Sequence, residues 1–335
     1  MIPGSPVLRQ VPAWQSALAR AIRDPAELLA AVGLGQEWLP AAQAAARLFP
    51  LRVPCGFVAR MRPRDPHDPL LRQVLPLAEE CLAVEGFGDD PVGDHAAMVA
   101  PGVLHKYEGR VLLTLTGACA VHCRYCFRRH FPYADANPAA DQWRGTLEYI
   151  AADESISEVI LSGGDPLTLP DRRLAGLVRE LATIPHLRRL RLHTRLPIVL
   201  PERVDDALLD WLGAAGFKTV VVVHVNHANE IDTLVRDALA RLKRAGVELL
   251  NQSVLLRGVN DSAGALVRLS EALVEAGVLP YYLHLLDRVR GAAHFEVPEE
   301  EARRLMAQLH RCLPGYLVPR LVREIAGAPG KVALV

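Results

Sequence analysis

Six short runs of β-branched and aliphatic residues alternate with amphipathic stretches from about residue 110 onward, and this alternation limits the possible folds most. The runs lie at residues 111–116, 158–161, 190–193, 219–224, 249–254 and 281–285. Helical patterns follow near residues 141–152, 171–182, 204–215, 230–245, 262–276 and 298–311. Such repetition predicts an α/β fold of βα units around a parallel sheet. Six units can form a partial (βα)6 barrel, and a doubly wound open sheet remains an alternative.

The chain divides by pattern into three parts. Residues 1–95 are rich in Ala and Leu and predict an N-terminal helical accessory segment, with helix starts at Asp24-Pro25 and Asp68-Pro69. Proline and glycine predict loops at residues 60–69 and near residue 90. We expect the core barrel at residues 96–315 and a C-terminal strand with a lysine-bearing loop at residues 316–335.

Charge and hydropathy narrow the class of partner. Lys plus Arg and Asp plus Glu each number 38, so no overall positive field attracts nucleic acid or anionic lipid. No apolar stretch reaches the roughly 18 residues that a membrane span needs, and the first residues do not resemble a signal peptide. We therefore expect a cytoplasmic protein with a small-molecule substrate. We expect neither nucleic acid nor a membrane as its partner.

Three of the six cysteines crowd into eight positions, as Cys119-Ala-Val-His-Cys123-Arg-Tyr-Cys126, directly after the first expected strand. Thiolates on one short loop can bind three irons of a four-iron cluster and leave the fourth iron open. A zinc site completed by His122 or His130 is the alternative, although no second cysteine pair follows. The remaining cysteines are expected to be inert and buried: Cys55, Cys81 and Cys312.

Other strand ends carry polar residues with two interpretations each. The turn Ser162-Gly163-Gly164-Asp165-Pro166 is either an ordinary turn or a place where a ligand approaches the backbone closely. His224 and His227 could be structural or could suggest a second metal, and neutral histidines bonded to neighbours are commoner.

The last residues carry a lone lysine. Lys331 follows Gly327-Ala328-Pro329-Gly330, which could be a frayed surface tail. A lysine on a loop of small residues could also carry pyridoxal phosphate (PLP) covalently.

Taken together, these motifs resemble a known family. The spacing Cys-x3-Cys-x2-Cys with Tyr125 before the last cysteine resembles the signature of radical S-adenosylmethionine (SAM) enzymes. With residues 163–167, residues 251–261 and the Lys331 loop, the chain from about residue 100 onward resembles the lysine 2,3-aminomutase family. The ending Arg-Glu-Ile-x-Gly-x-Pro-x-Lys is similar to the short branch that includes the elongation factor P modification enzyme B.

The resemblance implies three cofactors and a role for each matching residue. It implies a [4Fe–4S] cluster on Cys119, Cys123 and Cys126. It implies SAM on Tyr125, Gly163, Gly164, Asp165 and His193, with Thr194 and Arg195 nearby. It implies PLP bound covalently by Lys331, with its phosphate held by Arg110 and Lys106, Tyr107 beside them, and Gln252 facing the cofactors. It implies a substrate held by Arg128 at its carboxylate and by Asp287 and Glu324 at its side-chain ammonium.

The reaction implied is the conversion of L-α-lysine to β-lysine by an isomerase, with the R product and an external electron donor expected. The branch further implies a link to elongation factor P and its lysyl ligase. At Glu324, lysine-specific members carry aspartate, so the arm is longer here. Two acids suit a cationic side chain, and an aminomutase for another cation such as arginine is the alternative. A non-catalytic iron–sulfur or zinc protein that docks on a partner is a second alternative.

Overall fold

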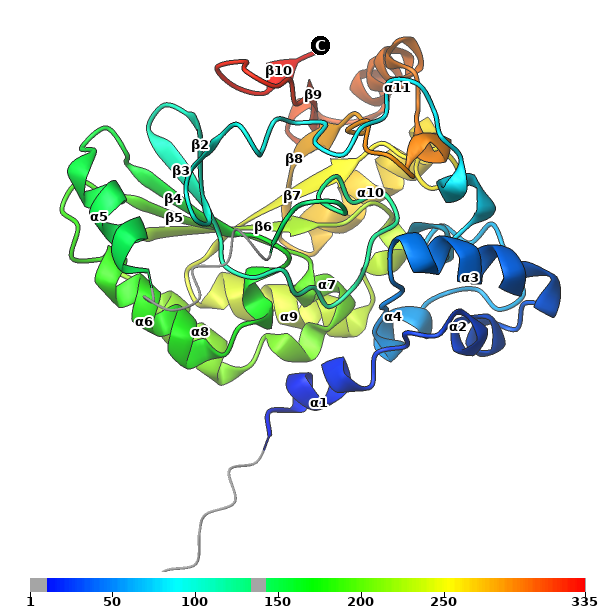
Figure 1. Cartoon of the computed structure of the whole chain (residues 1–335), viewed down its shortest axis with the longest axis horizontal. Helices are drawn as coiled ribbons and strands as arrows, with labels where there is room; N and C mark the ends of the chain where they lie inside the picture. The colour runs from blue at the N-terminus through cyan, green and yellow to red at the C-terminus, as the bar shows by residue number, and fades with distance from the viewer. Residues whose placement is uncertain (1–10, 134–142, 335) are drawn as a thin grey trace, which may run out of the picture.

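A computed structural model of the chain describes residues 11–133 and 143–334. Its centre is one ten-stranded sheet whose strands neighbour one another in chain order, from β1 to β10 (Figure 1). The strands are β1 Met98–Ala100, β2 Val103–Tyr107, β3 Arg110–Thr114, β4 Glu158–Ser162, β5 Arg189–Thr194, β6 Lys218–His224, β7 Glu248–Val254, β8 Leu279–His284, β9 Arg320–Arg323 and β10 Val332–Ala333. The six expected strands correspond to β3–β8.

Neighbouring strands from β3 to β9 pair in parallel. Because each strand pairs with the next one in the chain, the order never reverses, as it must in a doubly wound sheet. The helices of the βα units cover the outer face of the curved sheet (Figure 1). They are α5 Arg144–Ala152, α6 Asp171–Leu181, α8 Asp206–Gly213, α9 Thr233–Arg244, α10 Ala263–Glu275 and α11 Glu299–Cys312. The partial barrel is therefore confirmed.

Local side-chain caps explain where several outer helices begin. Asp205 accepts a hydrogen bond from the backbone of Leu208 at α8, and Asp232 accepts one from Val235 at α9. Each cap satisfies a backbone N–H that has no partner within the helix. Each of these two helices starts at the residue directly after its cap.

Antiparallel hairpins extend both edges of the sheet. At the C-terminal edge β9 and β10 pair with Arg323 opposite Val332. The next residues along the hairpin, Glu324 and Lys331, therefore face each other across the loop that joins these two strands. The register of this hairpin brings together two residues that lie seven positions apart in the sequence.

The N-terminal helices pack against the barrel. They are α1 Ala13–Ala19, α2 Pro25–Val32, α3 Leu39–Leu48 and α4 Cys55–Val58. Asp24 caps α2 as predicted. Contrary to the sequence prediction, no α-helix begins at Asp68-Pro69; Asp68 accepts hydrogen bonds from the backbone N–H groups of Leu70 and Leu71, where a short 3-10 helix begins, η2 Leu71–Gln73. Pro76 follows closely and cannot donate the backbone hydrogen bond that a longer helix needs.

One buried apolar cluster joins the N-terminal helices to the barrel. Trp14 and Leu28 belong to the same cluster as Val103, Leu113 and Leu161. The N-terminal helices thus share one hydrophobic core with the strands of the barrel. The division of the chain into two parts at residue 95 stays a prediction.

Two other expectations concern the surface. Cys55, Cys81 and Cys312 are exposed rather than buried as expected, because each lies at an end of a helix near the surface. Within residues 11–133 and 143–334, no helix is both long enough and apolar enough to cross a membrane.

Candidate active site

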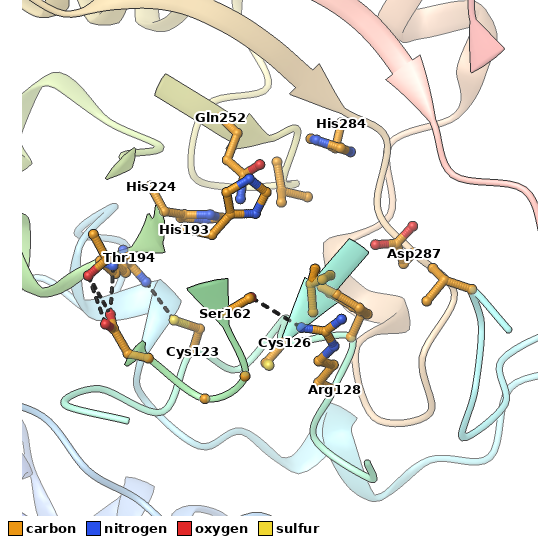
Figure 2. A pocket seen from close by; sticks show the side chains of 18 of the residues that line it. Cys123, Cys126, Arg128, Ser162, His193, Thr194, His224, Gln252, His284 and Asp287 are labelled. Atoms are coloured by element: carbon orange, nitrogen blue, oxygen red, sulfur yellow. Dashed lines mark hydrogen bonds between the residues drawn. The ribbon is translucent and has the colours of Figure 1, made fainter. Parts of the chain in front are cut away.

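A cavity of about 320 Å³ opens at the C-terminal ends of the parallel strands. Its lining includes every residue for which the sequence predicted a role: Cys119, Cys123, Cys126, Tyr107, Arg110, Tyr125, Arg128, Gly163, Gly164, Asp165, His193, Gln252, Asp287, Glu324 and Lys331. Figure 2 shows ten labelled side chains around this space, with Cys123 on one side and Asp287 on the other. The structure thus brings the predicted residues together, while their individual roles remain predictions.

The cysteine loop is held by a turn of its own backbone and by contacts with the N-terminal segment. It follows β3, and a tight turn joins the backbone N–H of Cys126 to the carbonyl of Cys123 at 3.0 Å. The backbone N–H of Arg124 donates to the carbonyl of Gln73 in the N-terminal segment, and its side chain donates to Glu80 at 2.6 and 2.8 Å. The N-terminal helices therefore hold the loop against the barrel.

The chemistry of the three thiols fits a cluster of metal ions. None is in a disulfide, and burial raises the pKa of Cys119 and raises that of Cys126 to about 11. A thiolate there needs a cation beside it, which iron supplies. Across the described part of the chain, no three His, Cys, Asp or Glu side chains are grouped around a single-ion position. Thiolates that bind separate irons of one cluster do not need to converge on one point.

Gly163 and Gly164 let the β4 loop lie directly against the chain that leads to the cysteines. Gly163 has φ +121°, and a Cβ atom there would lie 2.6 Å from the carbonyl oxygen of Thr116. A Cβ on Gly164 would lie 2.4 Å from the carbonyl oxygen of Ala118. Any larger residue would displace the cysteine loop, so these glycines have a packing role whatever ligand they also contact.

Asp165 ties the ends of β4 and β5 together. Its carboxylate accepts hydrogen bonds from the Thr194 hydroxyl and from the backbone N–H groups of Arg195, Leu196 and Leu167. Burial raises the pKa of Asp165 to about 6, although these donors favour its charged form. A contact between this carboxylate and SAM stays a prediction.

Tyr125 joins the cysteine loop to the end of β6. Its ring stacks on His224 with centroids 5.6 Å apart, and its hydroxyl lies 3.0 Å from Nε2 of His224. His227 instead accepts a backbone hydrogen bond from Asn229 at the start of η6 Ala228–Glu230. The two histidines therefore bond to different neighbours, as expected of structural histidines rather than of a second metal site.

The lysine end of the cavity is built from the C-terminal hairpin and β2. Lys331 Nζ lies 2.5 Å from Oε2 of Glu324, while the Tyr107 hydroxyl donates to Oε1. Burial alone would raise the pKa of Glu324, but Lys331 and Tyr107 together lower it. Lys106 lies 3.7 Å from the same carboxylate. Glu324 is thus an ionised carboxylate held between cations and a hydroxyl.

Asp94 is a residue of this site that the sequence analysis missed. Its carboxylate accepts from Lys106 at 2.6 Å and from Nε of Arg128 at 2.7 Å. It lies in the loop near residue 90, where a short Gly/Asp/Pro segment gave no signal beyond a turn. Asp94 orients the guanidinium of Arg128, whose Nη1 also donates to Ser162 at 3.3 Å.

Asp287 differs from Asp94 and Glu324 because, in the described part of the chain, no cation lies within ion-pair distance of its carboxylate. Among residues 11–133 and 143–334, no hydrogen bond or ion pair reaches its carboxylate, and burial raises its pKa to about 7. Lys331 lowers this pKa less than burial raises it. A half-buried carboxylate that lines a cavity and has no partner is an incomplete site for a cationic group.

His193 supplies a further sign that a ligand belongs in the cavity. Its Nε2 is buried and has no hydrogen-bond partner, and burial lowers the pKa of the ring well below its usual range. His193 lines the same cavity as Gln252 and His224, and Figure 2 labels all three. Unsatisfied buried polar atoms are rare, so the residues fit polar molecules such as SAM and PLP.

A partial barrel with three cysteines on the loop after its first parallel strand defines a radical SAM enzyme, and residues 113–269 match the family model for the radical SAM superfamily. The chain is 51% identical over 322 residues to the L-lysine 2,3-aminomutase of Escherichia coli (strain K12), covering 96% of this chain and 94% of that one. The chain belongs to the lysine 2,3-aminomutase family.

Two further relatives bear the same name. That of Haemophilus influenzae is 48% identical over 99% of this chain and 98% of its own, and that of Clostridium subterminale is 34% identical over 83% and 67%. Among solved structures, a radical SAM methyltransferase from Sphaerobacter thermophilus matches 68% of this chain and 72% of its own, at 17% identity and a TM-score of 0.42. That likeness is too distant to bear on function.

Family membership settles the class of chemistry. The protein is an isomerase that uses a [4Fe–4S] cluster, SAM and PLP. The non-catalytic docking protein considered from the sequence is therefore wrong.

Proposed function

We propose that this protein converts L-α-lysine to β-lysine. The observation that carries the proposal is the charge pattern at the lysine end, where Asp287 and Glu324 lie near Lys331 in a cavity that also holds the three cysteines. Two acids favour a substrate with a cationic side chain, whereas an anionic side chain would be repelled. Relatives named as L-lysine 2,3-aminomutases support the same substrate.

The residues divide between the cofactors and the substrate. In this proposal Cys119, Cys123 and Cys126 hold the cluster. Tyr125, Gly163, Gly164, Asp165 and His193 border SAM, and Lys331, Tyr107, Arg110 and Gln252 border PLP. When bound, the cluster and SAM supply the one-electron chemistry that removes a hydrogen atom from the substrate, and PLP holds the amino group that migrates.

Arg128 orients the substrate at its carboxylate end. The guanidinium is buried, and Asp94 binds its Nε, so the remaining N–H groups can meet a carboxylate. Arg110 lies over the ring of Tyr107, with its guanidinium carbon 4.8 Å from the ring centroid. Its position on the cavity wall suits an anionic phosphate.

Asp287 and Glu324 bind the other end of the substrate in this proposal. The ammonium of lysine would complete the partnerless carboxylate of Asp287. Glu324 would meet the same ammonium after its oxygen Oε2 has released Lys331. The buried walls limit access of water to the reacting atoms.

The test compares substrates on the reconstituted enzyme. Purified protein loaded with iron, sulfide, SAM and PLP and reduced with dithionite is expected to form β-lysine from lysine, and to turn over arginine more slowly. Absence of β-lysine while spectroscopy shows an intact cluster would overturn the substrate proposal. Faster turnover of arginine would favour the alternative.

We also propose that the product is the R enantiomer and that it serves in the modification of elongation factor P in the cytoplasm. The support is the similarity of the ending at residues 323–331 to the short branch of the family. Chiral chromatography of the product tests the first point. Mass spectrometry of elongation factor P, incubated with its lysyl ligase and the product of this enzyme, tests the second.

A further inference from the structure

Arg195 touches one of the three cysteines. Its Nη1 lies 2.7 Å from Sγ of Cys123 and 2.8 Å from the hydroxyl of Tyr125. Arg195 follows β5 directly, and its side chain is almost completely buried. The sequence suggested a contact between Arg195 and SAM, whereas the structure places the guanidinium against a cluster ligand.

The opposite edge of the guanidinium is held by buried acceptors. Nη2 donates to Oε2 of Glu230 at 2.9 Å and to Oε1 of Gln73 at 2.6 Å. Glu230 is itself fixed through Oε1, which accepts from Gln73 and from the backbone N–H groups of Asn226 and His227. The arginine therefore has little freedom to turn away from Cys123.

The ion pair between Arg195 and Glu230 is oriented with its positive side towards Cys123. Arg195 presents one nitrogen to the sulfur, and the carboxylate of Glu230 lies behind the other nitrogen. The positive charge is therefore closer to Cys123 than the negative charge that compensates it. Because the groups are buried, the surrounding water screens this difference weakly.

We propose that Arg195, held by Glu230 and Gln73, is a positioning residue that raises the reduction potential of the iron–sulfur cluster through its hydrogen bond to Cys123. One-electron reduction by the external donor adds negative charge to the cluster and its thiolates. A cation that donates a hydrogen bond to a thiolate stabilises the reduced form more than the oxidised form. The inference rests on the proposed cluster site.

Redox titration of the reconstituted holoenzyme, followed by the EPR signal of the reduced cluster, tests the inference. Arg195→Gln removes the cation and is expected to move the midpoint potential to more negative values. Glu230→Gln removes the compensating anion and is expected to move it to more positive values. Arg195→Lys keeps the charge but loses the planar fork, so its shift is expected to be smaller than that of Arg195→Gln.

Arg191→Gln is the matched control, because it also removes a cation that lines the cavity from β5. Arg191 pairs with Glu158 at 2.9 Å and makes no hydrogen bond to a cysteine within the described residues. The midpoint potential of the cluster in Arg191→Gln is expected to stay close to that in the unmodified enzyme.

The outcomes separate this inference from the proposed function. An EPR signal in the unmodified enzyme establishes the cluster independently of turnover, and its absence would sink the cluster site itself. An unchanged potential in fully loaded Arg195→Gln, or shifts of the same sign in Arg195→Gln and Glu230→Gln, would overturn the inference. If Arg195→Gln binds no cluster, the sign of the Glu230→Gln shift decides.

Discussion

The two ends of the cavity hold their charged groups in different ways. At the cysteine end, Arg195 and Asp165 each have several fixed protein partners, and both are nearly fully buried. At the lysine end, Lys331 and Glu324 pair mainly with each other, and Asp287 has no close partner in the described chain. The charged groups at the cysteine end thus have their hydrogen-bond partners within the protein. At the lysine end, Glu324 must exchange Lys331 for the substrate ammonium if it is to bind the substrate.

Glu324 shows what that exchange requires. Its Oε2 binds Lys331 and its Oε1 accepts from Tyr107, so neither oxygen is free for a substrate ammonium. In the proposed PLP site, a bond between Lys331 and PLP would change the hydrogen bond from Lys331 to Glu324, and Oε2 could then accept a new cation. We infer that PLP binding prepares the substrate site, which makes the two ends separable by mutation.

The largest expected effect comes from Cys123→Ala. Loss of one thiolate should leave the cluster incomplete and reduce β-lysine formation to background, since the radical chemistry depends on it. PLP bonded to Lys331 should persist, because that end is built from other elements. Iron analysis with mass spectrometry of the borohydride-reduced PLP adduct measures both. Loss of the adduct together with the cluster would show that the two ends are not independent.

Lys331→Ala tests the opposite end. Turnover is expected to fall by about 10³-fold or more, the scale seen when a covalent catalytic group is removed. The cluster should form normally, with the EPR signal of the unmodified enzyme. Lys218→Ala serves as a lysine control, because Lys218 is exposed, pairs with Glu248 and does not line the cavity, so the PLP adduct should stay in place. An adduct that remains in Lys331→Ala would assign PLP to another lysine.

The cysteine end was the easier part to predict from the sequence. Cysteine spacing, the two glycines and the strand pattern are local signals, and the parallel topology carries them to one edge of the sheet. The six strands and the six outer helices followed from hydrophobic periodicity in the same way. At Asp68 the pattern failed, because Pro76 limits the helix to a short turn.

Contacts between distant segments could not be predicted. Asp94 reaches Arg128 from a loop 34 positions away, and Gln73 reaches Arg195 from 122 positions away. Both depend on how the N-terminal segment packs on the barrel, which hydrophobic periodicity does not specify. The pairing of Glu324 with Lys331 depends on the register of one short hairpin.

Asp287→Asn should have a smaller effect, confined to substrate binding. The pKa of Asp287 is raised to about 7, and only the ionised carboxylate attracts an ammonium. As pH falls below about 7, kcat/KM for lysine should therefore decline by up to about tenfold per pH unit. Asp287→Asn should lose this acid limb and lower kcat/KM at pH 8 by about 10²-fold, the scale of breaking a buried pair.

A pH profile of kcat/KM for both proteins checks this prediction. Cluster content and PLP loading should match between them, so that only the substrate site differs. An acid limb that survives in Asp287→Asn would assign the titration to another group and leave Asp287 without the proposed role.

Glu324→Asp should give the smallest change and tests the depth of the pocket. Removing one methylene draws the carboxylate back towards the hairpin while keeping its charge, so kcat/KM for lysine should fall by no more than about tenfold. A longer cationic substrate gains the vacated space, so the ratio of arginine to lysine turnover should rise by about tenfold, the worth of roughly one methylene.

Glu324→Gln separates charge from length in this experiment. It keeps the arm but removes the anion, so it should weaken both substrates without favouring arginine. Competition assays with lysine and arginine in one mixture measure the ratio directly. If Glu324→Asp leaves that ratio unchanged while Glu324→Gln lowers both activities, Glu324 acts on charge alone. Pocket depth would then be set by other residues of the cavity, among which Asp287 is the acid without a partner in the described chain.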